Sequence, residues 1–351
     1  MAELTIEELT AKDIRTARAA IEHYYEEGYG DGLPVVPPIQ EFVDEVLSQT
    51  PRAKDEVLTS HYNVHRSCTI EQAAICSVMA GCKPEYFPIV VAALDALEST
   101  DGWRSAGLQS TTGGAQLLVI NGPVRQRFGF NSKQAVWGPG FRANATISRA
   151  IRLVVLDVFG IRSGEFDQAT QASPARYGFC IAENEEDSPW EPLHVERGFP
   201  ADANTVTVLG ARSVLHVEQR HSADPEVILA TIGDSMAYGG GFDPGHRLET
   251  SPPGNERSTT VMGPEHANVI ANRGWSKHDA KACLWDKYGR TAGELRRCGK
   301  GHGLEKEPDD AFIRFAKSPE SITIIVAGAY NCGISSVVTG GGGVTREIVW
   351  A

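Results

Sequence analysis

The stretch from Cys180 to Phe199 gathers more chemically reactive side chains than any other part of the sequence. It reads CIAENEEDSPWEPLHVERGF and combines a thiol, a run of carboxylates, an imidazole and a guanidinium. Crowded carboxylates repel one another, which raises the pKa of some of them and makes a general acid or base available near neutral pH, unless a cation or Arg197 neutralises the charge. This stretch is therefore the first candidate for a site of acid–base chemistry.

The candidates for catalysis within this stretch are Cys180, Glu183, Glu186 and His194. In an extended segment, residues two apart point to one face. His194 and Glu196 would then face one way, and Glu191 and Arg197 the other. Such a pairing can orient a catalytic histidine or bind a divalent metal ion. If a metal is present, its ligands would be Glu183, Glu186 and His194, whereas a structural network of ion pairs is the alternative.

Two loops are candidates for the walls of a binding pocket. Gly28 to Pro38, GYGDGLPVVPP, cannot be helical because three glycines and three prolines fall within it, so it either braces the fold or lines a site through Asp31. Arg142 and Asn144 precede a predicted helix, whose N-terminus can hold a carboxylate or phosphate; the alternative is a cap with a surface arginine. The candidate substrate-binding residues are Asp31, Arg142, Asn144, Trp190 and Arg197.

The seven cysteines are spread thinly, without a CxxC pair. This arrangement fits neither a secreted disulfide framework nor a zinc ribbon, so most should be reduced, buried thiols. Cys82, in a glycine turn before Pro84, and Cys332, after a predicted strand, are the better candidates for reactivity. Cys82 therefore joins Cys180 as a candidate catalytic thiol.

The elements that must position these residues alternate between strand and helix. Apolar runs bounded by turn residues predict strands over Gln116–Ile120, Tyr177–Ala182, Thr205–Leu209, Thr259–Met262 and Ile322–Ala327. Helical patterns cover Ile6–Glu27, Glu85–Leu97, Ala145–Phe159, Pro225–Ser235, Glu265–Asn272 and Lys277–Tyr288, and a capping box at Thr69 and Gln72 opens another helix.

This alternation indicates an α/β fold with mixed or mostly parallel sheets. We expect two lobes of similar size: residues 1–200, which carry the acidic segment, and residues 201–351. No linker marks the boundary, so a single domain is also compatible with the sequence.

The net charge of the chain argues against some classes of binding partner. The net charge of −12 repels nucleic acid and anionic lipid, and no basic patch offsets it. The N-terminus, MAELTIEELTAKDIR, does not have the apolar core of a signal peptide, and no apolar run reaches membrane-spanning length, so we expect a cytoplasmic protein. We also expect a homo-oligomer that binds a small molecule.

The chain resembles the bacterial family named for its Sec/Cys-Gly-Ser-Cys (UGSC) selenoprotein motif. The resemblance implies redox or reductive chemistry nearby, because some members carry that motif in a joined domain. This chain lacks the motif, and Gly113-Gly114 stands where relatives often carry His-Pro. A separate thiol or selenol protein could supply the missing group. The resembling segments are Gly30–Pro38, Met79–Leu97, Leu117–Pro123, Gly138–Leu153, Cys180–Phe199 and Gly263–Asp279.

The leading hypothesis is an enzyme that acts on a small anionic substrate with a thiol and carboxylate–histidine acid–base chemistry. Cys180 or Cys82 would be the nucleophile or redox group, His194 the proton shuttle and Arg142 the substrate anchor, with Glu183 and Glu186 as acid and base. One alternative is a metal-dependent lyase or hydrolase. Another is a non-catalytic partner subunit of a separate thiol or selenol protein.

Overall fold

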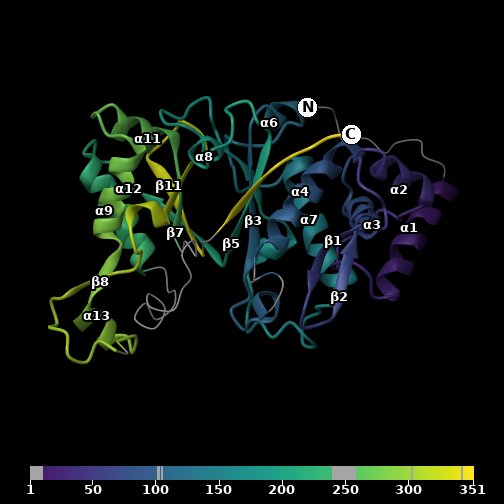
Figure 1. Cartoon of the computed structure of the whole chain (residues 1–351), viewed down its shortest axis with the longest axis horizontal. Helices are drawn as coiled ribbons and strands as arrows, with labels where there is room; N and C mark the ends of the chain where they lie inside the picture. The colour runs from purple at the N-terminus through teal and green to yellow at the C-terminus, as the bar shows by residue number, and fades with distance from the viewer. Residues whose placement is uncertain (1–10, 101–102, 104–105, 239–257, 302, 341–342) are drawn as a thin grey trace.

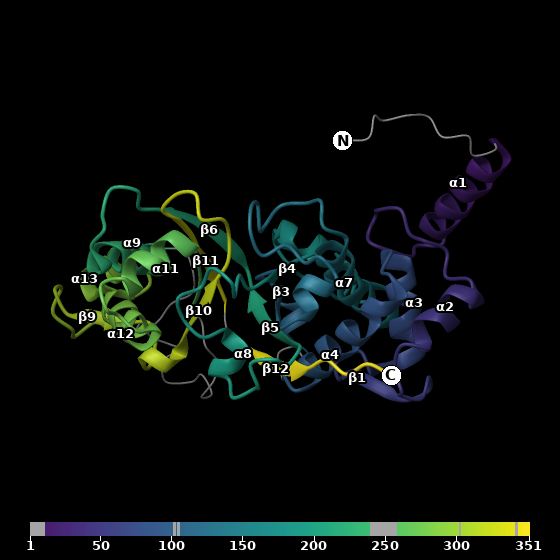
Figure 2. The same cartoon turned by 90° about the horizontal axis from the view of Figure 1, so that it is seen from above.

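The protein is built as four layers, a layer of helices on each side of two packed β-sheets (Figure 1). The computed structural model describes residues 11–100, 103, 106–238, 258–301, 303–340 and 343–351. The order of the layers from one end of the molecule to the other is helices, sheet, sheet, helices (Figures 1 and 2).

The first sheet has the strand order β12 (Val344–Glu347), β5 (Thr205–Ala211), β3 (Ala115–Asn121), β4 (Cys180–Ala182). The second has the order β6 (Ser213–Glu218), β11 (Ile334–Thr339), β7 (Ser258–Met262), β10 (Ile322–Val326). In each sheet one edge pair, β3 with β4 or β7 with β10, is parallel, and the other neighbours are antiparallel. The predicted α/β class with mixed sheets is confirmed.

The two sheets share one plan and exchange strands. β5 runs directly into β6 of the other sheet, and β11 continues into β12 of the first sheet. The edge strand β6 of the second sheet thus follows a strand of the first sheet, and the edge strand β12 of the first sheet follows a strand of the second. Strand membership does not follow the predicted division at residue 200, because β5 and β12 both belong to the sheet of β3.

A short sequence echo accompanies this repeated plan. A Gly-Pro pair follows β3 as Gly122-Pro123 and follows β7 as Gly263-Pro264. A Cβ atom on Gly122 would lie 2.1 Å from the carbonyl oxygen of Ala203, and one on Gly263 would lie 2.1 Å from that of Ile334. Only glycine permits such a close approach of two backbones.

Side-chain alternation along the strands explains the layers. On β3, Leu118 and Ile120 face the helices, whereas Leu117 and Val119 face the other sheet. The strands β3, β4 and β10 are buried on both faces and are apolar almost throughout. The first sheet is covered by α3 (Ile70–Ala80), α4 (Phe87–Glu98) and α7 (Arg142–Leu153), and the second by α9 (Pro225–Tyr238), α11 (Pro264–Ala271) and α12 (Lys277–Lys287).

Further described elements surround these layers. They are α1 (Ala11–Glu26), α2 (Gln40–Leu47), β1 (Val57–His61), β2 (Arg66–Thr69), α6 (Val124–Arg127), α8 (Leu193–Glu196), β8 (Gly289–Thr291), α13 (Ala292–Arg297) and β9 (Phe312–Arg314). β1 pairs with β2 and β8 with β9 in separate two-stranded sheets.

Most predicted elements are confirmed, including the capping box in which Thr69 and Gln72 bond each other's backbone. Of the predicted arm Ile6–Glu27, the residues before Ala11 lie outside the described residues. Tyr177–Ala182 was wrong in extent, because the strand covers only its last three residues. Asn144 is not a cap, since α7 begins two residues earlier, at Arg142.

Candidate functional site

The carboxyl ends of the two parallel strand pairs meet at one edge of the paired sheets. The Asn184 N–H, just after β4, donates to the Val326 carbonyl at the end of β10 (2.7 Å). The Gly328 N–H after β10 donates to the Ser132 carbonyl, in the loop that leads from β3 to α7 (2.8 Å). Sites in α/β proteins are usually built outside the carboxyl ends of the strands, so this edge is the place to examine first.

Glu183 is the most deeply buried carboxylate of the acidic stretch, with 1% of its surface exposed. Its Oε2 accepts hydrogen bonds from Asn121 Nδ2 (2.6 Å) and the Leu193 N–H (2.8 Å), and its Oε1 from the Val326 N–H (3.4 Å). Burial raises the pKa of Glu183, while the Lys277 ammonium and these hydrogen bonds oppose the rise. The carboxylate therefore ties β3, α8 and β10 together.

Arg125 on α6 holds the next two glutamates. Its Nη2 lies 2.9 Å from Glu185 Oε2 and 3.0 Å from Glu186 Oε1, and its Nη1 donates to the Glu183 carbonyl (2.9 Å). The hydrogen bond from Arg125 lowers the pKa of Glu186 to about 2. Glu186 therefore stays ionised, which does not fit the acid–base role predicted for it.

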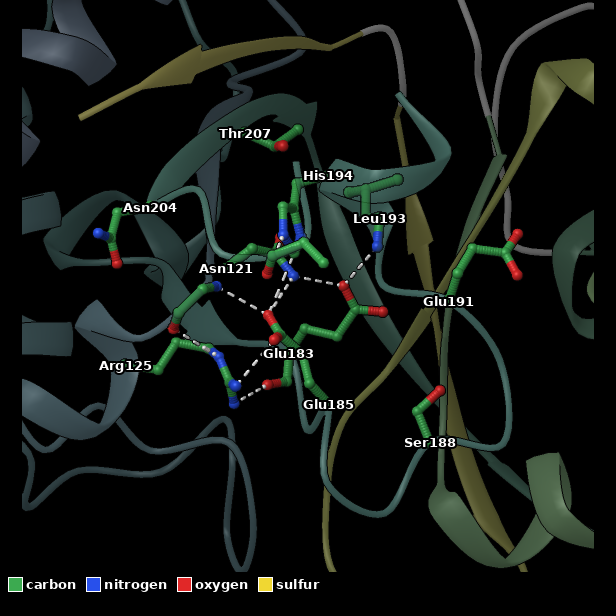
Figure 3. Close-up of polar contacts among 12 residues, drawn as sticks. Asn121, Arg125, Glu183, Glu185, Ser188, Glu191, Leu193, His194, Asn204 and Thr207 are labelled. Carbon is green, nitrogen blue, oxygen red and sulfur yellow. Dashed lines mark hydrogen bonds and ion pairs between the residues drawn. The ribbon is translucent and has the colours of Figure 1, made fainter. Parts of the chain in front are cut away.

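His194 lies beside this cluster, fully buried, with an unsatisfied ring nitrogen. Its Nε2 is 3.3 Å from the Ala201 carbonyl oxygen, and a carbonyl only accepts, so Nε2 carries the hydrogen. No described residue hydrogen-bonds to Nδ1, which lies 4.0 Å from Glu185 Oε1. Figure 3 shows His194 and Glu185 gathered with Asn121 and Glu183 in one region beside Arg125.

Glu185 is fixed in place from the other side. Its Oε1 accepts from Asn121 Nδ2 (2.9 Å) and from the Gly122 N–H (2.8 Å), at the turn that follows β3. Asn121 Nδ2 donates to both Glu183 and Glu185, and the buried Oδ1 has no hydrogen-bond partner among the described residues. Two buried acceptor atoms, on Asn121 and His194, thus lack donors in the same region.

The extended conformation predicted for the segment after Pro192 was wrong. Residues 193–196 form the short helix α8, so His194 and Glu196 do not share a face with period two. Glu196 instead accepts from two buried lysines, with 2.6 Å to Lys277 Nζ and a short contact to Lys281 Nζ. His194 is turned inward while Glu196 links α8 to α12.

Cys180 and Cys82 do not fit the role of reactive thiol. Both are buried in the core between the first sheet and its helices, and Cys180 faces away from Glu183, which follows it by three residues. Burial raises the pKa of Cys82 to about 12 and that of Cys180 further still. The nucleophilic thiolate is therefore scarce near neutral pH at either position. Cys332, in the loop after β10, is only partly buried.

The predicted substrate-binding residues on the helical side are occupied by internal contacts. Asp31 pairs with Arg149 (2.8 Å) and Arg142 Nε donates to the Gly81 carbonyl (3.0 Å). Asn144 is buried, where its Oδ1 accepts from the Asn131 N–H (2.9 Å) and its Nδ2 donates to the Cys180 carbonyl (3.0 Å). The loop Gly28–Pro38 therefore braces the fold through Asp31, and Asn144 positions β4 instead of an anion.

The other two predicted binding residues also make internal contacts. Trp190 Nε1 donates to the Trp275 carbonyl (3.2 Å), next to α12. Arg197 Nη1 donates to the Gly343 carbonyl and to Thr345 Oγ1, at 3.1 Å each, on β12. Asp31, Arg142 and Asn144 thus lie on or against α7, whereas Trp190 and Arg197 contact Trp275 and the β12 region, so the five residues predicted for substrate binding do not form one group.

The predicted metal set is not arranged around a common point. Glu183 directs its oxygens at N–H donors and Glu186 is paired with Arg125, which leaves His194 without the other two as co-ligands. Among the residues that the structure describes, no group of three or more histidine, cysteine, aspartate or glutamate side chains is placed to hold a metal ion.

A second buried histidine, His266 on α11, lies at the end of β7 and is fully bonded. Its Nε2 donates to the Gln219 carbonyl (2.9 Å), and its Nδ1 accepts from Ser335 Oγ (2.8 Å), which itself accepts from the Gly263 N–H (3.1 Å). Burial lowers the pKa of His266. A structural role for His266 fits this network.

The lowered pKa of His266 predicts a loss of stability in mild acid. The unfolded chain takes up a proton at the ordinary histidine pKa of about 6.5, and the folded chain resists it, so the free energy of unfolding should fall as pH drops below that value. We expect urea midpoints between pH 7.5 and 5.5 to depend less on pH in His266→Gln than in the wild type. His216→Gln, at an exposed histidine, is the control and should keep the wild-type slope. Equal slopes in all three proteins would contradict the assignment.

Sequence reasoning missed Asn121 and Arg125, although both follow the predicted strand Gln116–Ile120 within a few residues. The signal was their position after a strand in an α/β pattern, next to a Gly-Pro turn.

No helix in the described part of the chain has the length and apolar character needed to cross a bilayer. No protein-family model and no curated protein matches the sequence, so the resemblance to the UGSC family stays a prediction.

Proposed function

We propose that this chain is an enzyme that acts on a small polar molecule by general acid–base chemistry, with Glu185 and His194 as the proton-transfer pair. The observation that carries the proposal is the buried Nδ1 of His194, which has no hydrogen-bond partner in the described part of the chain and lies 4.0 Å from Glu185 Oε1. The pair lies at the carboxyl ends of the parallel strands β3 and β4, where sites in α/β folds are built.

His194 Nδ1 and Glu185 Oε1 cannot hydrogen-bond to each other directly and need a third group between them. Nδ1 of the neutral ring and a carboxylate oxygen are both acceptors, and 4.0 Å is too long for a direct hydrogen bond. A buried acceptor left without a donor costs about 1–3 kcal/mol. A proton, a water molecule or a substrate O–H or N–H between the two atoms would remove this cost, so the arrangement favours binding a hydrogen-bond donor.

The surroundings support proton transfer at this position. The Gly122 N–H and Asn121 Nδ2 fix one oxygen of Glu185, and Arg125 holds the other, so the carboxylate is oriented before a substrate binds. Glu185 keeps 14% of its side chain exposed, which gives the pair a path to solvent, whereas His194 is closed off behind it. Neither Cys82 nor Cys180 takes part in the proposed chemistry.

The test is a substrate screen with a matched pair of variants. The purified chain is incubated with pools of small hydroxy acids, amino acids and amines in D₂O, and mass spectrometry follows consumption and deuterium uptake. We expect Glu185→Gln to lower turnover by roughly 10²-fold because the amide cannot accept the proton. Glu191→Gln is the control, since its side chain is exposed and lies away from the cluster (Figure 3). Equal turnover by wild type and Glu185→Gln would refute the assignment.

A further inference from the structure

The N-terminal helix α1 stands away from the layered body (Figure 2). The side chains of residues 15–19 are exposed, and the helix contacts the core near its end. There Tyr24 packs against the core, and its carbonyl accepts from the Tyr29 N–H (2.9 Å). Isolated helices of this length are marginal in water, so a helix that is exposed on most sides needs a partner surface.

The end of α1, the loop that follows it and the start of α2 expose six large apolar side chains. Within residues 25–42 they are Tyr25, Tyr29, Leu33, Val36, Ile39 and Phe42, each between 39% and 65% exposed. Scattered exposed apolar residues are normal, but a run of six within eighteen positions marks an interaction surface. We call α1 together with these six residues the arm surface.

The arm surface has a rigid base. The Gly30 N–H donates to the Asp157 carboxylate (3.1 Å), and the Val36 N–H donates to the Met79 carbonyl (3.1 Å). Asp31 is paired with Arg149 on α7. These contacts hold the loop between α1 and α2 against the body, so its apolar side chains are presented outward in a fixed arrangement that costs little entropy on binding.

The charges of α1 point to a second copy of the same chain as the occupant. Arg15 and Arg18 lie in its first half and Glu22 and Glu26 in its second half, and all four are exposed. No ion pair between described residues involves any of the four. Two such helices laid antiparallel bring the basic half of each against the acidic half of the other, with Ala17 and Ile21 near the crossing. A two-fold axis repeats every contact, as expected for an isologous dimer.

We propose that the arm surface is the interface of a homodimer in which the two α1 helices pair antiparallel. An α1 of 16 residues is about 24 Å long, and with the adjoining apolar residues it can supply the roughly 800 Å² per partner of a standard interface. An anionic membrane is the disfavoured occupant, since the chain has a net charge of −12 and the neighbouring α2 exposes Glu41, Asp44 and Glu45.

The first experiment measures mass in solution by light scattering and sedimentation velocity. The full-length wild type should run at twice 37.9 kDa at micromolar concentration. Ile21→Asp and Ile39→Asp should shift it towards the monomer, with an unchanged circular dichroism spectrum of the body. Val227→Asp, at a 42% exposed valine on α9, is the matched control and should stay dimeric. A monomeric wild type, or arm variants as dimeric as the control, would overturn the proposal.

The second experiment tests the antiparallel pairing by charge reversal. Arg18→Glu and Glu22→Arg should each weaken the dimer at least tenfold, because each places like charges together at two symmetric positions. The double variant Arg18→Glu with Glu22→Arg should recover the wild-type dissociation constant, since the opposite charges face each other again. Failure of the double variant to recover, or binding of the wild type to phosphatidylserine vesicles through the arm in place of dimerisation, counts against the model.

Discussion

Replacing Arg125 by alanine is expected to lower the free energy of unfolding by about 3 kcal/mol, because it removes a buried guanidinium and leaves the largely buried Glu185 and the more exposed Glu186 without their cation. The guanidinium is 7% exposed and lies within 3.0 Å of an oxygen of both Glu185 and Glu186. It also donates to the carbonyls of Gly122 and Glu183, which lose their partners in the variant. The loss is measured by urea unfolding at pH 7.

Two comparisons make this prediction specific. Arg125→Lys should recover little of the stability, since an ammonium cannot reach two carboxylates and two carbonyls at once in the fork geometry of the guanidinium. Arg220→Ala removes an exposed partner of Glu218 and should change stability by less than about 1 kcal/mol. In Arg125→Ala the pKa of Glu186 should also rise from about 2 towards its ordinary value, a change visible in the NMR titration of the carboxyl carbon. An unfolding curve like that of Arg220→Ala would show that the cluster is not held by this arginine.

Replacing His194 by glutamine is expected to reduce turnover of the substrate by about 10²–10⁴-fold while the fold persists, because glutamine is polar and of similar size but carries no transferable proton. If the proposed pair operates, the loss falls on kcat more than on KM. The measurement uses the substrate identified in the deuterium screen.

His216→Gln is the matched control for this second prediction. His216 is exposed, pairs with Glu218 and lies on β6, away from the cluster. It should leave the rate and the pH profile unchanged. A His194→Gln protein that turns over at the wild-type rate would remove His194 from the mechanism and leave it as a buried structural residue.

Local pattern was enough to predict many of the elements. The run Gln116–Ile120 is apolar and ends at Gly-Pro, and it forms β3 within one residue at each end. The Thr69 and Gln72 capping box forms as written because it depends only on residues three apart. The sequence did not predict which strands pair with each other. Nothing local to β5 or β11 says that the following strand crosses into the other sheet, because pairing is decided by packing between residues far apart in the chain.

The acidic stretch shows the same division in the site itself. Its sequence alone identified Glu183 and His194 as side chains to examine and placed them after a strand. Only the tertiary structure decided what each carboxylate does: Arg125, some sixty residues away in the chain, fixes Glu186 as an ion, while burial raises the pKa of Glu183. Burial likewise removed Cys180 from consideration. Residue types set which chemistry is available, but pKa and accessibility depend on neighbours that the fold brings together, and these are not encoded in local spacing.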